Sequence, residues 1–219
     1  MDSSMVQTTP SSLPVSSPAS YRCQFINQWS AARHPVDYPS GTAHWSPPVL
    51  LAHDSGYDLW SVGGQTTPGT QLLAETGAVS GVVAETSRAG YGGMVVGVPQ
   101  FNVDQQSQTV GTVMLTAARP MLSTMSMIAP SPDWFTGVSG MDLRDTSSNT
   151  WYGSVTVETA PFDAGTDSGS TYGSPDRATR PHQPIFELTP RTVPGRVLLD
   201  PSGREVPTVA RWECVLVNA

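Results

Sequence analysis

The sequence contains no lysine, and charged residues are scarce in it. All 11 basic residues among the 219 are arginines, and charged residues together make up 13% of the chain. Without lysine, the chain has no residue for a Schiff base, a P-loop or a lysine acid–base step. The net charge of −7 also argues against a polyanion, so we expect no nucleic acid as a partner.

Long apolar runs are missing and cysteines are few. No stretch approaches the roughly 18 apolar residues of a membrane-spanning helix, so we expect no transmembrane segment. The first 20 residues lack the basic and apolar regions of a signal peptide, so an exported chain has lost its leader or uses another route. The two cysteines form no CxxC motif, which argues against a zinc site.

Turn-forming and β-compatible residues are abundant instead, with 20 glycines and 20 prolines. From Tyr21 onward, apolar and polar residues alternate as in a half-buried strand. Further β-rich segments follow, each bounded by Gly, Pro, Asp or Ser: 94–101, 110–117, 122–128, 151–157, 185–188, 193–199 and 209–217. We therefore predict an all-β fold, an antiparallel β-sandwich.

Two regions depart from this pattern. Residues 70–89 carry helix formers and apolar pairs at near-helical spacing, which predicts one or two short helices at an edge of the sandwich. Residues 1–20 are rich in Ser, Thr and Pro. Such a segment buries too little apolar surface to offset its ordering entropy, so we expect a disordered tail or linker. The predicted organisation is a tail over 1–20 and a sandwich domain over 21–219.

Three aspartates are candidate metal ligands. Asp133 follows Pro130 and Pro132, which stop ladder pairing and stiffen the turn. Asp163 and Asp167 lie among small residues that let backbone carbonyls approach an ion. Carboxylates and carbonyls on rigid loops suit a hard cation such as Ca²⁺. The alternative, which the residue types alone favour, is that these aspartates cap turns.

Five segments together resemble one known family. They are WSAARHPVDYP (29–39), HWSPPVLLAHDSGYDLWSVG (44–63), AETG (74–77), SMIAPSPDWFTGVSGMDL (126–143) and DAGTDSGSTYGSP (163–175). In this order they resemble the spondin domain family, the N-terminal domain of F-spondin and mindin. The resemblance implies an extracellular, C2-like β-sandwich with a calcium-like ion held by Asp133 and Asp163. By ungapped counting, a further acidic ligand of the family falls on Met114, so Asp167, carbonyls or water would complete the site.

Other chemistry-bearing residues have structural interpretations. We expect the tryptophans of these segments to anchor the core or loops. His34, His44 and His53 lack HxH or HExxH spacing, so we expect them to be hydrogen-bonded loop anchors. Ser139 lies in a segment that misses GxSxG at its last position, so we expect no nucleophile there and no enzymatic activity.

The two cysteines lie in the predicted first and last strands, Cys23 beside Phe25 and Cys214 beside Trp212 within two residues. Terminal strands are neighbours in many sandwiches, so one interpretation is a disulfide. The other is a pair of buried free thiols, which the residues favour. Both interpretations stay open at this point.

Two functions fit the sequence and the resemblance. The first is a secreted, non-catalytic adhesion or binding module of the cell surface or extracellular matrix, with a structural calcium-like ion and a protein or glycan partner. The second is a building block of a microbial envelope or surface assembly, since the thrombospondin-type repeats that accompany the domain in F-spondin and mindin are absent from this sequence. For both functions we expect an extracellular or cell-surface location.

Overall fold

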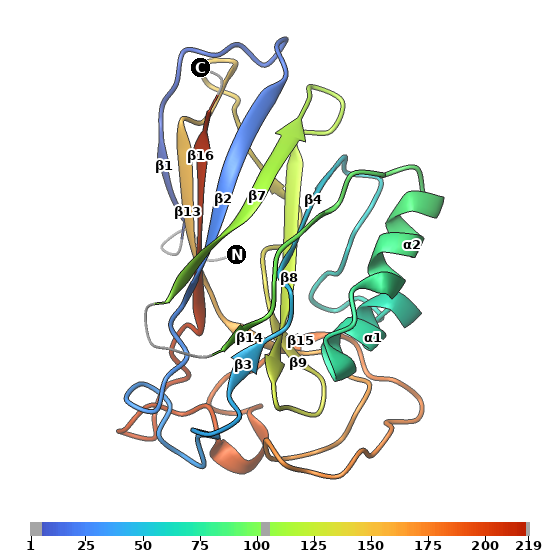
Figure 1. Cartoon of the computed structure of the whole chain (residues 1–219), viewed down its shortest axis with the longest axis vertical. Coiled ribbons are helices and arrows are strands. Elements are labelled where there is room, and N and C mark those ends of the chain that lie inside the picture. The colour runs from blue at the N-terminus through green and yellow to red at the C-terminus, as the bar shows by residue number, and fades with distance from the viewer. Residues whose placement is uncertain (1–5, 102–105, 218–219) are drawn as a thin grey trace.

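Two antiparallel sheets and two short helices make up the computed structural model, which describes residues 6–101 and 106–217 (Figure 1). The longest loops gather at one end of the molecule, at the bottom of Figure 1. The predicted β-sandwich with short helices is confirmed.

The first sheet has five strands in the order β1-β13-β16-β2-β7. Buried and less buried residues alternate along β13 and β16, because a strand that covers a core on one face turns every second side chain toward it. The strands are β1 (Val6–Thr9), β2 (Ala19–Asn27), β7 (Ser107–Leu115), β13 (Ser154–Thr159) and β16 (Ala210–Leu216).

The second sheet has nine strands built around β8 (Met121–Ala129), which is buried from its second residue to its last. The first sheet covers one face of this strand and the helices cover the other, so both faces are apolar. Its other strands are β3 (His44–Trp45), β4 (Val49–His53), β5 (Val95–Val96), β6 (Gln100–Phe101), β9 (Trp134–Thr136), β10 (Met141–Asp142), β14 (Pro161–Asp163) and β15 (Phe186–Glu187). A separate two-stranded sheet pairs β11 (Arg144–Asp145) with β12 (Thr150–Trp151).

The two predicted helices are confirmed as α1 (Pro68–Thr76) and α2 (Ser80–Arg88). The hydroxyl of Thr67 caps the start of α1 by accepting the Thr70 N–H at 3.1 Å, and Gly77 ends the helix in the left-handed conformation (φ 72°). Apolar side chains of both helices pack on the second sheet in a shared core cluster. Among the described residues, no helix is long and apolar enough to cross a membrane.

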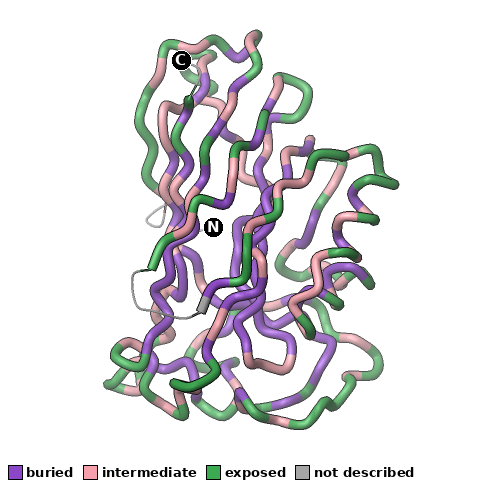
Figure 2. The backbone as a smooth tube through the Cα atoms, viewed as in Figure 1, coloured by how far each residue is buried: buried purple, intermediate pink, exposed green. Residues whose placement is uncertain are grey.

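The main core fills the space between the sheets, where the backbone in Figure 2 is buried. Phe25 packs edge-to-face against Trp45 and Trp212, with ring centroids 5.0 Å apart in each pair. The tryptophans of the five segments quoted from the sequence are all buried, which confirms their predicted structural role. Cys23 and Cys214 lie directly opposite each other on β2 and β16, with Cα atoms 4.1 Å apart, and form a disulfide. The interpretation as buried free thiols is therefore wrong, because strand pairing places the two cysteines in contact.

Residues 193–199, predicted as a strand, form a turn instead. Pro194 to Arg196 make a short 3₁₀ segment with Gly195 at φ 58°, because proline donates no N–H to a ladder and glycine adopts a positive φ without strain. Val197, Leu198 and Leu199 are buried all the same. Their apolar pattern reflects burial in the core rather than strand pairing.

Part of the segment predicted as a tail forms a strand. Residues 1–5 lie outside the described residues, but β1 pairs antiparallel with β13 from Val6↔Val157 to Thr9↔Ser154. Three of its four side chains are exposed, so backbone hydrogen bonds rather than apolar burial hold it at the sheet edge. A composition argument based on apolar burial does not detect such a strand.

Candidate metal centre at the loop end

Asp133 lies at the loop end, defined here as residues 130–133 between β8 and β9 and residues 164–185 between β14 and β15. Its side chain is fully buried. Oδ2 accepts three hydrogen bonds, from the N–H of Thr166 at 2.7 Å, the N–H of Asp167 at 3.0 Å and the hydroxyl of Thr166 at 3.2 Å. Oδ1 is buried without a hydrogen-bond partner. One oxygen of Asp133 therefore joins the two loops, and the other has unused acceptor capacity.

Asp163 is brought beside Asp133 by strand pairing. It ends β14 and lies opposite Trp134 of β9, the residue after Asp133. Its Oδ1 accepts the N–H of Gly165 at 2.8 Å, and its residue is 6% exposed. The buried indole N–H of Trp134 lies close enough to lower the pKa of Asp163, although it completes no hydrogen bond. The two loops thus hold two buried acids together.

Burial and mutual repulsion disfavour the charged forms of both acids. Burial raises the pKa of Asp133 to about 6, and the N–H groups of Asp167 and Thr166 offset part of that rise. The pKa of Asp163 rises to about 7, first because of burial and then because of the charge on Asp133. A pair of this kind favours either a retained proton or a bound cation. The unpartnered Oδ1 of Asp133 fits a cation, since it is an oxygen ligand with a free lone pair.

Comparison with known proteins identifies the family of this chain. The family model described as Spondin_N matches residues 19–207. The chain belongs to the Spondin_N family. Spondin-1 of Gallus gallus is 33% identical over 216 residues, which cover 88% of this chain and 25% of that protein. Spondin-2 of Homo sapiens is 31% identical over 204 residues, which cover 88% of this chain and 60% of that protein. The chain therefore spans about a quarter of the Spondin-1 relative, and the resemblance found in the sequence is confirmed.

Asp167, the third candidate ligand, holds its own loop in this Spondin_N domain. Its Oδ1 accepts the N–H of Gly169 at 2.7 Å, and its Oδ2 accepts the N–H of Arg177. Together with Asp163 it lines a cavity of about 150 Å³ at the surface of the loop end. Its carboxylate thus acts as a turn cap, and its role as a ligand remains a prediction.

No group of three or more His, Cys, Asp or Glu side chains with metal-binding geometry occurs in residues 6–101 and 106–217. A cation at the loop end would therefore depend on Asp133 and Asp163 together with backbone carbonyls or water. Such mixed oxygen ligands are typical of calcium rather than of zinc.

The structure does not bring Met114 to this site. Met114 is 62% exposed on β7, where it pairs with Ser20 near the end of the sheet opposite the loop end. β7 also contains a bulge, because its register shifts between the partners of Cys23 and Gln24. A bulge of this kind adds one residue to a strand and moves the side chains after it to the other face.

His34, His44, His53 and Ser139 each form a hydrogen bond with a backbone carbonyl, which confirms the histidines as hydrogen-bonded anchors. His34 Nε2 pairs with the Pro207 carbonyl at 3.3 Å, and His44 Nδ1 with the Thr42 carbonyl at 2.7 Å. His53 lies between the Asp54 carbonyl and the Ser123 hydroxyl, at 2.8 Å from each. The hydroxyl of Ser139 donates to the carbonyl of Trp60 at 2.6 Å.

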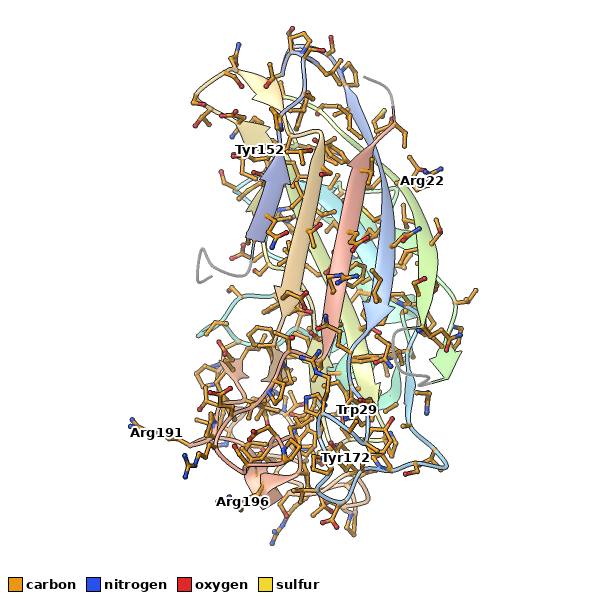
Figure 3. The ribbon with its side chains drawn as sticks, turned by 90° about the vertical axis from the view of Figure 1, so that its left-hand side faces the viewer. Arg22, Trp29, Tyr152, Tyr172, Arg191 and Arg196 are labelled. Atoms are coloured by element: carbon orange, nitrogen blue, oxygen red, sulfur yellow. A yellow bond between two sulfur atoms is a disulfide. The ribbon has the colours of Figure 1, made fainter. Side chains whose placement is uncertain are left out.

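Sequence reasoning missed two residues that hold the loop end in place. Thr166 supplies two of the three donors to Asp133, and Tyr172 accepts the indole N–H of Trp29 at 3.2 Å while donating to the Val197 carbonyl. Figure 3 shows Trp29 and Tyr172 side by side near this end of the molecule. The sequence contains one signal that could have identified Thr166, namely its position between the candidate ligands Asp163 and Asp167.

Proposed function

We propose that this Spondin_N domain is a secreted, non-catalytic binding module of the cell surface or extracellular matrix. We further propose that a calcium-like divalent cation fixes its loop end. Family membership supports the binding role. The Cys23–Cys214 disulfide supports an oxidising, extracellular location, since such bonds are rare in the cytosol of most organisms.

The single observation that carries the cation proposal is the buried pair Asp133 and Asp163. Neighbouring N–H groups offset only part of the cost of burying their negative charges. Asp133 would contribute its unpartnered Oδ1, and Asp163 a carboxylate oxygen. A divalent cation supplies positive charge that removes the repulsion between them. Asp167, backbone carbonyls and water are proposed to complete the oxygen shell.

The chain's own residues explain how such a site would serve binding. Asp133 already ties the loop before β9 to the loop after β14 through Thr166 and Asp167. Fixing both loops lowers the entropy that the surface loses when a partner binds, which favours affinity. The hydroxyl of Ser139 donates to the carbonyl of Trp60, and the neighbouring His53–Ser123 pair is fully buried. Both observations support a non-catalytic role.

Thermal melting with calcium, with magnesium and with EDTA tests the cation site. A cation that binds only the folded state adds RT ln(1 + [L]/Kd), about 2.7 kcal/mol at a hundredfold excess over Kd. For a chain of this size that corresponds to a rise of roughly 5–10 °C in Tm. Asp133→Asn and Asp163→Asn should abolish most of the rise. Asp145→Asn, in a surface turn where Asp145 accepts the N–H of Ser147, is the matched control and should keep it.

An unchanged midpoint on chelation, together with no bound metal by elemental analysis, would show that these aspartates are turn caps. The binding role is tested separately, by screening the purified domain on glycan and cell-surface arrays with and without chelator. Binding to defined partners supports the module. Blank arrays combined with self-assembly of the domain would favour the alternative, a building block of a surface assembly.

A further inference from the structure

A cavity of about 550 Å³ lies between the C-terminal end of α1 and the strands β3 and β8. Its volume falls in the range of about 300–1,000 Å³ that is typical of ligand sites. Trp45, Met127 and Pro99 contribute apolar walls, and Glu75 and Thr76 contribute the helix side. His44, Ser46, Pro47, Gly77, Ala129, Pro130 and Ser131 complete the lining.

Hydrogen bonds and close packing hold these walls in place. The Ser46 hydroxyl accepts the N–H of Met127 at 2.8 Å, and the Ser126 hydroxyl donates to the Ser46 carbonyl at 2.9 Å. Gly77 packs so tightly on Ser46 that a Cβ on Gly77 would lie 3.0 Å from the Ser46 Cβ. The cavity is therefore formed before any ligand arrives, which reduces the cost of binding.

Glu75 gives this cavity a negative wall in an unusual position. It lies in the last turn of α1, where the helix dipole is negative and basic residues are preferred, yet this turn has no basic residue. Its carboxylate accepts the side-chain N–H of Gln71 at 2.9 Å, and none of the ion pairs among the described residues includes it. A negative charge at this end destabilises the helix, so a cationic group of a partner that neutralises the carboxylate would bind favourably.

A smaller cavity of about 140 Å³ extends the same groove toward the loop end. Glu75 and Thr76 line both cavities, and the smaller one adds Asp167 and Asp176. Among the described residues that line the two cavities, none is an arginine. The groove thus combines apolar and proline walls with carboxylates and the negative end of a helix.

We propose that this groove binds a basic, extended segment of a partner protein, with one arginine or lysine side chain inserted beside Glu75. The aliphatic part of such a side chain suits the Met127 and proline walls, while its charged head pairs with the carboxylate. A second basic residue of the segment would face Asp176. This inference rests on the proposed binding function and assigns it a site and a class of partner.

Sulfated or otherwise anionic glycans are the wrong partners for this groove. The carboxylate of Glu75, the helix end and the net charge of −7 all repel them. A neutral glycan brings no positive charge to pair with the carboxylate of Glu75. Charge complementarity therefore selects a cationic peptide among the partner classes considered for the domain.

Fluorescence anisotropy with the intact chain tests the proposal, using a short labelled peptide that carries arginines between prolines. The matched peptide carries citrulline, which keeps the shape and removes the charge. We expect the arginine peptide to bind in a salt-dependent way and the citrulline peptide to bind about tenfold or more weakly. Glu75→Gln should weaken binding of the arginine peptide by a similar factor. Glu205→Gln, the same change at an exposed site outside the groove, should not.

Stability separates loss of the site from loss of the fold. Glu75→Gln and Thr76→Lys should keep or raise Tm, because each makes the end of α1 less negative, while both weaken peptide binding. Equal binding of the two peptides, or equal binding by Glu75→Gln and the natural protein, would overturn the proposal. If the peptides do not bind but the arrays show a partner, this inference fails and the proposed function stands. If the arrays show no partner but the peptide binds in a way that depends on Glu75, this inference stands and the proposed function fails.

Discussion

The body of the sandwich and its loop end hold their chains together by different means. In the body, the disulfide between Cys23 and Cys214 lies in an apolar core beside Phe25 and Trp212. At the loop end, apolar packing around Tyr172 is joined by buried carboxylates, and Asp133 connects two loops through three hydrogen bonds. The body therefore depends on covalent and hydrophobic terms that change little with pH or ions, whereas the loop end depends in part on charge.

A second contrast shows what is particular to the loop-end acids. Asp200 caps a surface turn and accepts hydrogen bonds from Ser202, Arg204 and Glu205, which lower its pKa. Asp133 and Asp163 accept hydrogen bonds as well, but burial and their proximity raise their pKa values. Hydrogen bonds from N–H groups thus stabilise the charged form of an aspartate in an exposed turn, but they do not offset burial and repulsion in a buried pair.

Removing the disulfide should give the largest change in stability and leave the loop end intact. For Cys23→Ala combined with Cys214→Ala, we expect the free energy of unfolding to fall by about 2–5 kcal/mol. The rise in Tm with calcium should stay the same, because the two regions are held independently. Denaturant unfolding and melting with and without calcium measure both quantities. A lost calcium response would show that the body and the loop end are coupled.

A change of pH should affect the loop end with a smaller magnitude. In EDTA, the folded state keeps protons on Asp133 and Asp163, whose folded pKa values of about 6 and 7 exceed those of the unfolded chain. Stability from this source is present at low pH and is lost as pH rises through those values. Between pH 6.5 and 8 we expect a loss of about 1 kcal/mol relative to Asp163→Asn.

The use of Asp163→Asn as the reference cancels a contribution of opposite sign. Burial lowers the pKa of His34 to about 4, so His34 adds stability as pH rises through the range in which the unfolded histidine loses its proton. Both proteins contain His34, and the difference between them isolates the aspartates. Identical pH profiles for the two proteins would contradict the raised pKa values.

The smallest effect is expected at the surface turn. Asp200→Asn should lower Tm slightly at pH 7, because the lowered pKa of Asp200 stabilises the folded state only above the pKa of the unfolded acid. The difference from the natural protein should vanish at strongly acidic pH. The calcium response should not change. A reduced calcium response in this variant would place the turn in the cation site.

The sequence predicted the sandwich, the two helices and the region of the candidate site, because each has a local signal. Alternation from Tyr21 onward marks β2, and helix formers with apolar pairs at near-helical spacing mark the two helices within residues 70–89. The resemblance to spondin domains implies that Asp133 and Asp163 share an ion, and strand pairing explains how they lie side by side.

Features that depend on partners distant in the sequence could not be predicted from local pattern. The Cys23–Cys214 pairing depends on β2 lying beside β16, and β1 depends on an exposed edge of β13. The bulge in β7 has no apolar signature in the sequence. Glu75 has no distinguishing signal in the sequence, because the cavity beside it is lined by strand residues distant along the chain.

Calorimetric titration of calcium in buffers of different ionisation enthalpy tests the central claim most directly. If a cation replaces the protons shared by Asp133 and Asp163, binding at pH 6 should release protons to the buffer, and the release should fall toward zero by pH 9. One site per chain is expected, and Asp133→Asn combined with Asp163→Asn should remove both the binding heat and the proton release. No saturable heat in the natural protein, or calcium binding that releases no protons at pH 6, would contradict the claim that this buried pair holds a cation.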